Sequence, residues 1–593
     1  MELQYDRYFE KLKGCFTGKC VGGTLGMKYE GDLNVHEITY YDPVPTEMLP
    51  NDDLDIQVIM LELLVKKGLP VSRFHLGDVW KYYYDDQMPD EYGAAKSNNE
   101  KGIFAPLSGR YNNKFFAGMG SAIRSELWAC LAPGDPALAA RLAVEDACTD
   151  HYDDGIDAER FLAALESAVF VTDDLNEAIE TAYGFLEPEG KLARAFADVR
   201  TWYAADPDVL RVREKVLAKY PADNWTDVTI NLSFILLALL VSGGDFSCGI
   251  CTAVSLGYDT DCTGATTGSI LGILNPAGIE ERWTKPIGEA LVLSANIPNM
   301  CESRTVGEFC DVVAAMSTEI LTYYGSEVTV QPTVFAPYIA KPWCKNIRQM
   351  PAHAETKTES LIAVTPFVVH LEYPEHVALC SNRENKFALC IGNPTEQKRC
   401  GSVSIGLPQV IIAAPNAFTF ELEPGQEMRF PFTLEKAYFK RRIQSNRLIF
   451  RFEADGFIWQ CEAGVPDARC AKREDLSTGK TETVEIPAAF FPVPAGKYRY
   501  TFRVKSGIEQ TVRMTVNGTA AEKVYMNDEY IAERDFTQPY VPAFHRGQCA
   551  LVTLKNGWNT LELVFENDKE TEAFVEFATD HGCAEWLTNL EYC

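Results

Sequence analysis

Hydrophobic residues in the first half of the chain recur with the period of an α-helix. Ile56, Ile59, Met60, Leu63 and Leu64 follow the spacing of a single helix face. The same periodicity covers residues 9–22, 138–149, 227–240, 263–274 and 306–324. Few strand-like segments interrupt these helices. We therefore predict one all-α domain over residues 1–325, with its polar loops gathered over one face.

The pattern changes after this helical half. Four prolines are spaced along residues 326–359, which cannot sustain a helix and which we interpret as a linker or a wrap-around arm. Short alternating apolar and polar runs follow, separated by Pro, Gly and Asn, and this alternation is typical of β-strands. The predicted fold is thus multidomain: the all-α domain is followed by a β-sandwich over residues 360–471 and a jelly-roll-like β domain over residues 472–593.

Two Asn-Gly pairs mark turns within the last domain. Residues 517–518 and 556–557 have the composition of tight turns between strands. The surrounding run Val-Thr-Leu-Lys-Asn-Gly-Trp-Asn-Thr-Leu, residues 552–561, resembles jelly-roll carbohydrate-binding modules. Shaping an active-site rim and pairing two protomers into a homo-oligomer remain alternative roles for the β domains.

Charge and composition exclude several functions. The 593 residues carry a formal net charge of -29, which repels phosphate backbones and anionic lipid, so we expect neither nucleic-acid nor membrane binding. The longest apolar stretch, residues 232–241, is about half a membrane span and is better interpreted as a buried helix. The N-terminus lacks the basic and apolar regions of a secretion signal, which predicts a cytoplasmic protein with mostly reduced, buried cysteines.

Two acidic motifs are the main candidates for chemistry. Residues 51–55, Asn-Asp-Asp-Leu-Asp, and residues 259–261, Asp-Thr-Asp, each open an apolar helical segment. Carboxylates placed in this way can hold Mg²⁺, which prefers oxygen ligands in an octahedral array. Each motif taken alone also fits helix capping, with the carboxylates complementing the helix dipole.

Four sequence blocks occur together in a characteristic order. They are the glycine-rich run at residues 14–31, Asn-Asp-Asp at 51–53, Gly-Met-Gly-Ser-Ala-Ile-Arg at 118–124 and Gly-Tyr-Asp-Thr-Asp-Cys-Thr-Gly-Ala at 257–265. In this order and spacing the chain resembles the ADP-ribosylglycohydrolase family over roughly residues 8–325. The resemblance implies an all-α fold that uses two Mg²⁺ ions to hydrolyse a ribosyl bond.

The resemblance also assigns roles to individual residues. It implies that Asp52, Asp53, Asp259 and Asp261 are metal ligands and that Glu30 lies at the mouth of the same site. Glu30 and Asp53 are then the two candidates for the catalytic base.

Substrate binding is implied for a second group of residues. His151 stands where the family often has a histidine near its substrate cleft, although a histidine in a loop is as often structural. The family's glycine loop corresponds to Gly118, Met119 and Gly120. Arg124 follows this loop, where it either clamps an anionic substrate or anchors Glu126 or Glu145.

Three departures from the family pattern affect these roles. The family usually has Thr before the paired Asp and after Asp-x-Asp, whereas this chain has Asn51 and Cys262. An Asn carbonyl can replace a Thr hydroxyl on Mg²⁺, but a thiol is a poor substitute, so we expect Thr263 or a water to complete that shell. Met119 replaces the Asn of the family's glycine loop, which weakens the expected preference for the diphosphate of ADP-ribose.

The sequence therefore predicts a Mg²⁺-dependent glycohydrolase acting on a small-molecule glycoside or ADP-ribosyl substrate. Two alternatives remain: a glycosidase that uses two carboxylates without metal, and a catalytically silent protein that binds a sugar or nucleotide.

Overall fold

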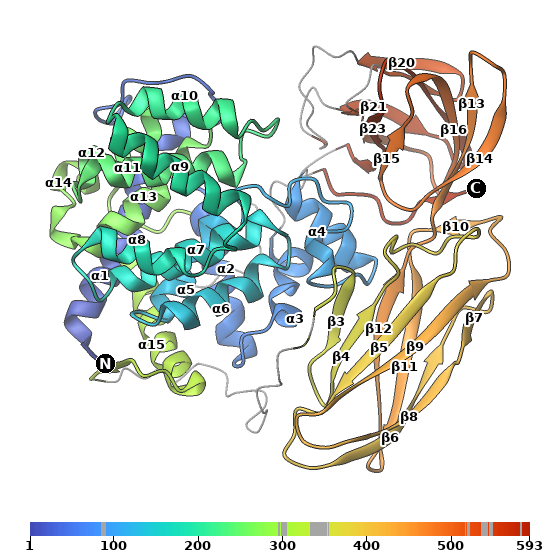
Figure 1. Ribbon diagram of the computed structural model, residues 1–593, viewed down its shortest axis with the longest axis horizontal. Coiled ribbons are helices and arrows are strands. Elements are labelled where there is room, and N and C mark those ends of the chain that lie inside the picture. The colour runs from blue at the N-terminus through green and yellow to red at the C-terminus, as the bar shows by residue number, and fades with distance from the viewer. Residues whose placement is uncertain are drawn as a thin grey trace. The chain divides into compact units, whose positions relative to one another are not determined.

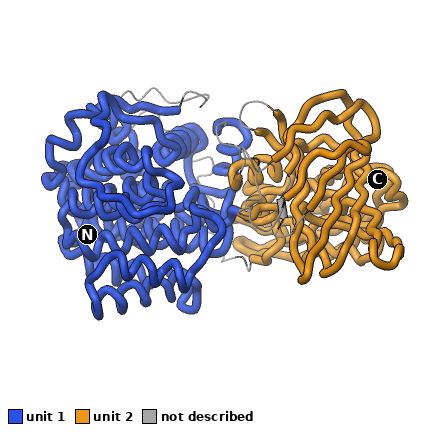
Figure 2. Tube along the Cα trace, turned by 90° about the horizontal axis from the view of Figure 1, so that it is seen from above, with its two compact units in different colours: residues 1–86, 115–343 blue, residues 87–114, 344–593 orange. Residues whose placement is uncertain are grey.

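The computed structural model describes residues 1–84, 90–294, 297, 305–332, 353, 355–515, 517–518, 522–534, 544, 549–580 and 584–593. The chain divides into two compact units (Figure 2). Unit 1 contains residues 1–86 and 115–343, and unit 2 contains residues 87–114 and 344–593. The predicted all-α N-terminal half and β-rich C-terminal half are confirmed (Figure 1).

Unit 1 is built almost entirely of helices. In chain order its α-helices are α1 Tyr5–Gly26, α2 Asp52–Lys67, α3 Arg73–Leu76, α5 Ser125–Leu131, α6 Pro136–Ala147, α7 Asp154–Val169, α8 Leu175–Tyr183, α9 Lys191–Ala205, α10 Val209–Lys219, α11 Val228–Ser242, α12 Phe246–Ser255, α13 Thr260–Leu274, α14 Glu281–Ile287 and α15 Val306–Tyr324. Helix α11 is buried along almost its whole length, as the apolar stretch at 232–241 predicted. Among the described residues, no helix is both long and apolar enough to cross a membrane.

Helices α1 and α13 lie in direct backbone contact. A Cβ atom added to Gly18 would lie 2.1 Å from the carbonyl oxygen of Gly268, and one added to Gly22 would lie 2.0 Å from that of Gly264. The same contact repeats along both helices in opposite directions, and at its end the Thr260 hydroxyl donates a 2.8 Å hydrogen bond to the carbonyl of Gly26. Glycine at every fourth position thus holds the end of α1 against the start of α13.

A short parallel pair closes unit 1. Strand β1, Glu2–Gln4, pairs with β2, Thr329–Gln331, which lies inside the predicted linker 326–359. The remaining prolines of that linker, Pro337, Pro342 and Pro351, lie outside the described residues. The domain boundaries inferred from the sequence stay a prediction.

Unit 2 begins with a β-sandwich. One sheet has the order β3-β4-β5-β9-β7 and the other has the order β12-β11-β6-β8. These strands are β3 Glu359–Ala363, β4 Val368–Glu372, β5 Lys386–Gly392, β6 Arg399–Gly406, β7 Ile411–Ala414, β8 Ala417–Leu422, β9 Glu427–Lys436, β11 Asn446–Ala454 and β12 Phe457–Val465. Alternate residues of the strands fill one aromatic and aliphatic core between the two sheets.

The last part of unit 2 contains three further sheets around a second core. Their orders are β10-β25-β16-β22-β19-β20 with β13 and β14 alongside, β15-β23-β18, and β21-β17-β24. The strands are β10 Arg442–Ile443, β13 Arg469–Asp475, β14 Thr481–Ile486, β15 Phe490–Val493, β16 Gly496–Ser506, β17 Gln510–Thr515, β18 Asn517–Gly518, β19 Glu522–Met526, β20 Glu529–Arg534, β21 Cys549–Leu554, β22 Gly557–Asn567, β23 Thr571–Phe574, β24 Phe577–Thr579 and β25 Glu591–Tyr592. A jelly-roll topology for this part stays a prediction.

Neither Asn-Gly pair forms a turn within a β-hairpin. Asn517 and Gly518 form strand β18 and pair with Phe574 and Ala573, so the predicted turn at this position is wrong. Gly557 has a φ of +101° and joins β21 to β22, which belong to different sheets. The second pair therefore turns the chain between sheets rather than within a hairpin.

One helical segment belongs to the β-rich unit. Residues 87–114 contain α4, Glu91–Glu100, and they cluster with unit 2 although unit 1 surrounds them in sequence. Ile103, Leu107 and Tyr111 are part of the sandwich core. The Gly464 amide donates a 2.8 Å hydrogen bond to the Gly102 carbonyl. The periodic segments identified in the sequence do not include this helix, and they do not indicate the core on which it packs.

Candidate metal centre

The start of α2 contributes the first acidic motif. Asn51 is the N-cap, and its Oδ1 accepts a 2.7 Å hydrogen bond from the Asp53 amide. Its Nδ2 donates a 3.3 Å hydrogen bond to Asp261 Oδ2, some 210 residues further along the chain. The capping interpretation therefore holds for Asn51, which leaves the Asp53 side chain available for another role.

The start of α13 contributes the second motif. Asp259 is the N-cap residue, but its side chain makes no capping hydrogen bond, while its amide donates to Asn231 Oδ1. Asp259 and Asp261 are both buried. The Cys262 thiol donates to Asp53 Oδ1, with 3.3 Å between sulfur and oxygen. Helices α2 and α13 thus meet through hydrogen bonds between their first turns.

Two carboxylate oxygens at this meeting point have no hydrogen-bond partner. They are Asp53 Oδ2 and Asp261 Oδ1, and both are buried. Asp53, Asp261 and Cys262 each offer a ligand atom, and these atoms lie within 4.8 Å of one another. Unpartnered buried anions are costly, and a cation between them would remove that cost. The donor set thus fits a bound cation.

Burial, and at Asp53 and Asp259 also mutual repulsion, favours the protonated forms of these groups in the metal-free chain. Burial raises the pKa of Asp53 well above its usual range, with Asp261 adding to the rise and Lys19 opposing it. Burial and the charge of Asp261 raise the pKa of Asp259 in the same way. Burial likewise raises the pKa of Asp261. A bound cation would reverse these shifts, because it favours the charged carboxylates.

Glu30 lies on the open side of the cluster. Its side chain reaches solvent, yet enough of the carboxyl is enclosed for burial, followed by the charges of Asp261 and Asp52, to raise its pKa to about 8. Asp52 is half-buried in the first turn of α2. Thr263 is buried one residue beyond Cys262, and its hydroxyl makes a long 3.4 Å hydrogen bond to the Thr260 carbonyl.

A buried ion pair supports the first turn of α2 from behind. Lys19 Nζ donates to Glu126 Oε1 and to the Ile123 carbonyl, each at 3.0 Å. Gln57 Nε2 lies 2.9 Å from both the Asp53 carbonyl and Glu126 Oε2. Sequence reasoning missed these positioning residues. The available signal was a lysine and a glutamine within otherwise apolar helical segments.

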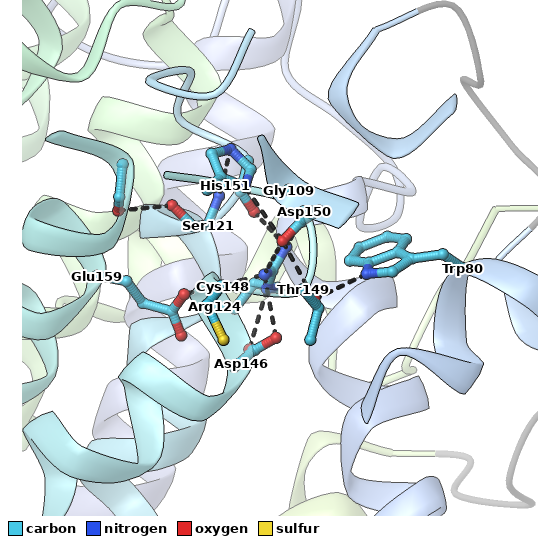
Figure 3. A network of polar contacts seen from close by, with 12 residues as sticks. Trp80, Gly109, Ser121, Arg124, Asp146, Cys148, Thr149, Asp150, His151 and Glu159 are labelled. Atoms are coloured by element: carbon cyan, nitrogen blue, oxygen red, sulfur yellow. Dashed lines mark hydrogen bonds and ion pairs between the residues drawn. The ribbon is translucent and has the colours of Figure 1, made fainter. Parts of the chain in front are cut away.

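Arg124 lies in a separate acidic cluster, which we call the Arg124 cluster (Figure 3). Its side chain is fully buried, with Nε donating to Asp146 at 3.0 Å and both Nη atoms donating to Asp150 at 2.8 and 2.9 Å. Nη1 also donates to the Gly120 carbonyl. The Trp80 ring packs 5.2 Å from the guanidinium carbon. Arg124 therefore bonds to carboxylates of the protein, and these are Asp146 and Asp150 rather than the expected Glu126 or Glu145.

His151 and the glycine loop belong to the Arg124 cluster. The Ser121 amide donates to His151 Nε2 at 3.2 Å, and His151 Nδ1 lies 3.1 Å from Asp150 Oδ1. His151 is fully buried, as is the Met119 side chain apart from 1% of its surface. Gly118 forms an isolated bridge with Asp227. The structure brings together Asn51, Asp53, Asp261 and Cys262, and it places Arg124 and His151 in a separate network.

The aromatic and amide-rich residues between Trp80 and Asn113 pack mainly inside the protein. Trp80 is buried and donates to the Thr149 hydroxyl at 2.8 Å. In unit 2, Asn98 Nδ2 donates to the Ser108 and Tyr111 carbonyls. Residues 85–89 of this segment lie outside the described residues.

Comparisons with solved structures gave several partial likenesses. An "ADP-ribosylglycohydrolase-related protein complex" is 20% identical, with 48% of this chain and 94% of that chain covered and a TM-score of 0.35. An anti-sigma factor domain-containing protein from Clostridium clariflavum is 9% identical, with 36% and 87% covered and a TM-score of 0.18. An α-L-rhamnosidase from Aspergillus terreus is 12% identical, with 38% and 28% covered and a TM-score of 0.15.

A search among curated proteins gave no match. The family model for ADP-ribosylglycohydrolase matches residues 4–313, just over half of the chain. This range contains both acidic motifs and the helix pair α1–α13. The chain belongs to the ADP-ribosylglycohydrolase family.

Proposed function

We propose that the chain hydrolyses the glycosidic bond of a ribosyl or related small-molecule substrate at the carboxylate cluster, with Mg²⁺ as cofactor. Family membership points to a hydrolase of glycosyl bonds. The observation that carries the proposal is the pair of buried, unpartnered oxygens of Asp53 and Asp261, contributed by two helices far apart in sequence. No lysine or arginine is among the hydrogen-bond partners recorded for these two carboxylates.

Oxygen ligands favour Mg²⁺ over softer ions. Asp52, Asp53, Asp259 and Asp261 would hold two such ions, with Asn51 and Thr263 or a water completing the shells. When bound, Mg²⁺ supplies charge stabilisation and orientation for substrate hydroxyls. The Cys262 thiol donates to Asp53, which orients that carboxylate without requiring sulfur as a ligand.

Glu30 is the better placed of the two candidate bases. Asp53 is 1% exposed and its oxygens face Cys262 and the interior of the cluster, whereas Glu30 reaches solvent. A carboxylate at the open side can accept a proton from a water that attacks the anomeric carbon. Asp53 then acts as a ligand, and Glu30 as the base.

The substrate is defined more by its ribosyl part than by a diphosphate. Arg124 and His151 are buried and bonded to Asp150, and Met119 is buried, so these residues offer little to a diphosphate. We therefore direct the proposal to the bond between the ribosyl group and its leaving group. The Arg124 network would act by positioning the glycine loop.

Hydrolysis assays test this proposal. ADP-ribosyl conjugates, nucleosides and small furanosides would be incubated with the full chain, with Mg²⁺ or with EDTA. Turnover should require Mg²⁺ and should be lost in Asp261→Ala and Asp259→Ala. Asp208→Asn, which keeps a helix cap far from the cluster, is the matched control and should retain activity.

The remaining outcomes identify the alternatives. Turnover that persists in EDTA and in both variants would establish a metal-independent glycosidase. Saturable ligand binding without turnover would establish a silent binding protein.

A further inference from the structure

A second group of metal-ligating side chains lies on the β-sandwich of unit 2. His353, Glu359 and His370 each offer a ligand atom, and these atoms lie within 4.8 Å of one another. This group shares no residue with the carboxylate cluster of unit 1. From its geometry we propose that His353, Glu359 and His370 form a zinc site.

Strand register explains how these residues meet. In the antiparallel ladder β3-β4-β5-β9, Glu359 lies opposite Glu372, and His370 lies opposite Cys390. Opposite residues share a face, as do residues two apart on one strand, so Glu359 and His370 both lie on the face away from the sandwich core. Glu427 of β9 reaches the same face through its pairing with Gly392.

The outer face of a sandwich is normally solvated, but this part of it is not. Glu359 is 0% exposed and His370 is 7% exposed. The His353 ring stacks on the His370 ring with 3.9 Å between centroids and an interplanar angle of 18°. Two imidazoles and a carboxylate are thus held close together on this face.

The spacing of the ligand atoms suits a tetrahedral ion. His353 Nε2 lies 3.1 Å from Glu359 Oε1, and His370 Nδ1 lies 3.2 Å from the same oxygen. Zinc bonds of about 2.0–2.1 Å place neighbouring ligand atoms roughly 3.3 Å apart in a tetrahedron. Glu359 Oε1 and His370 Nδ1 are buried without a hydrogen bond of good geometry, as two ligand atoms that face a common point would be.

Hydrogen bonds from neighbouring groups orient these ligand atoms. Glu427 lies 2.9 Å from His353 Nδ1, and His353 Nε2 lies 3.2 Å from Glu359 Oε2. A bound ion would take the place of this second contact, with Glu427 holding the tautomer that presents Nε2 as a ligand. The Thr356 amide and hydroxyl both donate to Glu359 Oε2, leaving Oε1 for the ion. Arg429, the nearby cation, is paired with Glu372 in two-pronged fashion and does not neutralise Glu359.

The ligand types select the ion. Two imidazole nitrogens and one carboxylate oxygen favour Zn²⁺ over Mg²⁺, which prefers oxygen ligands alone. A water would complete the tetrahedron. The ion would fasten His353, which precedes the sandwich in the chain, to the outer face of the sheet.

Metal analysis of the full-length protein tests this site. The chain would be stripped with a chelator, dialysed, and titrated with Zn²⁺ in excess Mg²⁺. We expect one tightly held Zn²⁺ that is lost in His370→Asn. His376→Asn is the matched control, since His376 lies in the same domain and contacts Asn385 instead. Asp261→Asn, in the other cluster, should also leave this zinc in place.

A milder variant and a spectroscopic measurement keep the test decisive if His370→Asn does not fold. Glu427→Gln, at an exposed position, should weaken Zn²⁺ binding by about 10- to 100-fold. Co²⁺ in the site should give the visible absorption of a four-coordinate ion without a thiolate charge-transfer band. Absence of bound Zn²⁺ in the unmodified protein would leave only a hydrogen-bonded cluster bridged by a protonated His353. A thiolate band would place the ion at a cysteine, such as Cys262 or Cys390 opposite His370, instead of at the proposed ligands. Either result overturns the proposal.

Discussion

The helical unit contains two clusters of buried carboxylates, and only one of them is bonded to an arginine of the protein. In the first, Asp146 and Asp150 surround Arg124, which bonds to both of them. In the second, Asp53 and Asp261 approach each other with unpartnered oxygens. The first cluster contains its own cation, although Asp146 Oδ1 and both oxygens of Glu159 also lack a hydrogen-bond partner there, whereas no lysine or arginine of the described residues bonds to Asp53 or Asp261 in the second. Of two equally buried acidic clusters, one can therefore pair with a cation of the protein while the other is open to a bound metal ion.

The pKa shifts express the same contrast. Burial raises the pKa of Asp150, but the charges and hydrogen bonds of Arg124 and His151 lower it by more, so that the pKa of this carboxyl falls to about 2. Asp146 shares the same guanidinium, yet burial and the charge of Asp150 leave its pKa raised. We interpret Asp150 as the principal charged partner of Arg124. At Asp53, by contrast, burial outweighs the opposing charge of Lys19, and the pKa of this carboxyl is raised.

Removal of the built-in cation should have the largest effect. Arg124→Met should destabilise the protein by about 3–5 kcal/mol, because it leaves Asp146 and Asp150 buried without their counter-charge. Urea unfolding monitored by circular dichroism measures this change. Arg211→Met, which removes an exposed ion pair with Asp206, should leave the free energy of unfolding nearly unchanged. Equal stabilities of the two variants would contradict the structural role of Arg124.

Neutralisation of a carboxylate in the second cluster should have the opposite effect on stability. Asp261→Asn should lower kcat/KM by more than about 100-fold, because a metal ligand is lost. The same change should raise the melting temperature in EDTA, since it removes repulsion among buried acids. Assays with Mg²⁺ and thermal scans with EDTA measure the two effects. A lower melting temperature would place Asp261 among the structural acids.

Glu30 should give the second cluster a characteristic pH dependence. Its folded-state pKa of about 8 lies above the usual 4.5. Between these pH values the folded chain keeps a proton that the unfolded chain has lost, so this group makes metal-free stability fall as pH rises from about 4.5 to 8. Glu30→Gln should reduce that fall, as thermal scans in EDTA across this range would measure. Parallel profiles for both proteins would contradict the shift.

Cys262 should have the smallest effect. Cys262→Thr restores the hydroxyl usual in the family at this position and should lower the Mg²⁺ concentration for half-maximal activity by up to about 10-fold. Metal titrations of initial rates measure it. Cys248→Ser, at an exposed cysteine, serves as the control. An increased Mg²⁺ requirement would indicate that the thiol helps to bind the ion through Asp53.

Local patterns predicted the elements, but not every partnership between them. Periodicity identified α11 and alternation identified the β-rich half, because both depend on neighbouring residues. The acidic motifs were also visible as helix starts. The partners of Arg124 were not, since Asp146 and Asp150 are selected by the packing of helices rather than by sequence distance. Packing likewise assigns α4 to unit 2.

The contact between α1 and α13 sets how the second cluster can evolve. Where backbones touch at Gly18 and Gly268, there is no layer of side chains that could be exchanged to adjust the separation. Evolution can therefore change side chains around the cluster, as at Cys262, far more easily than the separation of these two helices. The separation of α1 and α13 is fixed by this contact, and new chemistry in this protein must come from substitutions at the ends of the two helices.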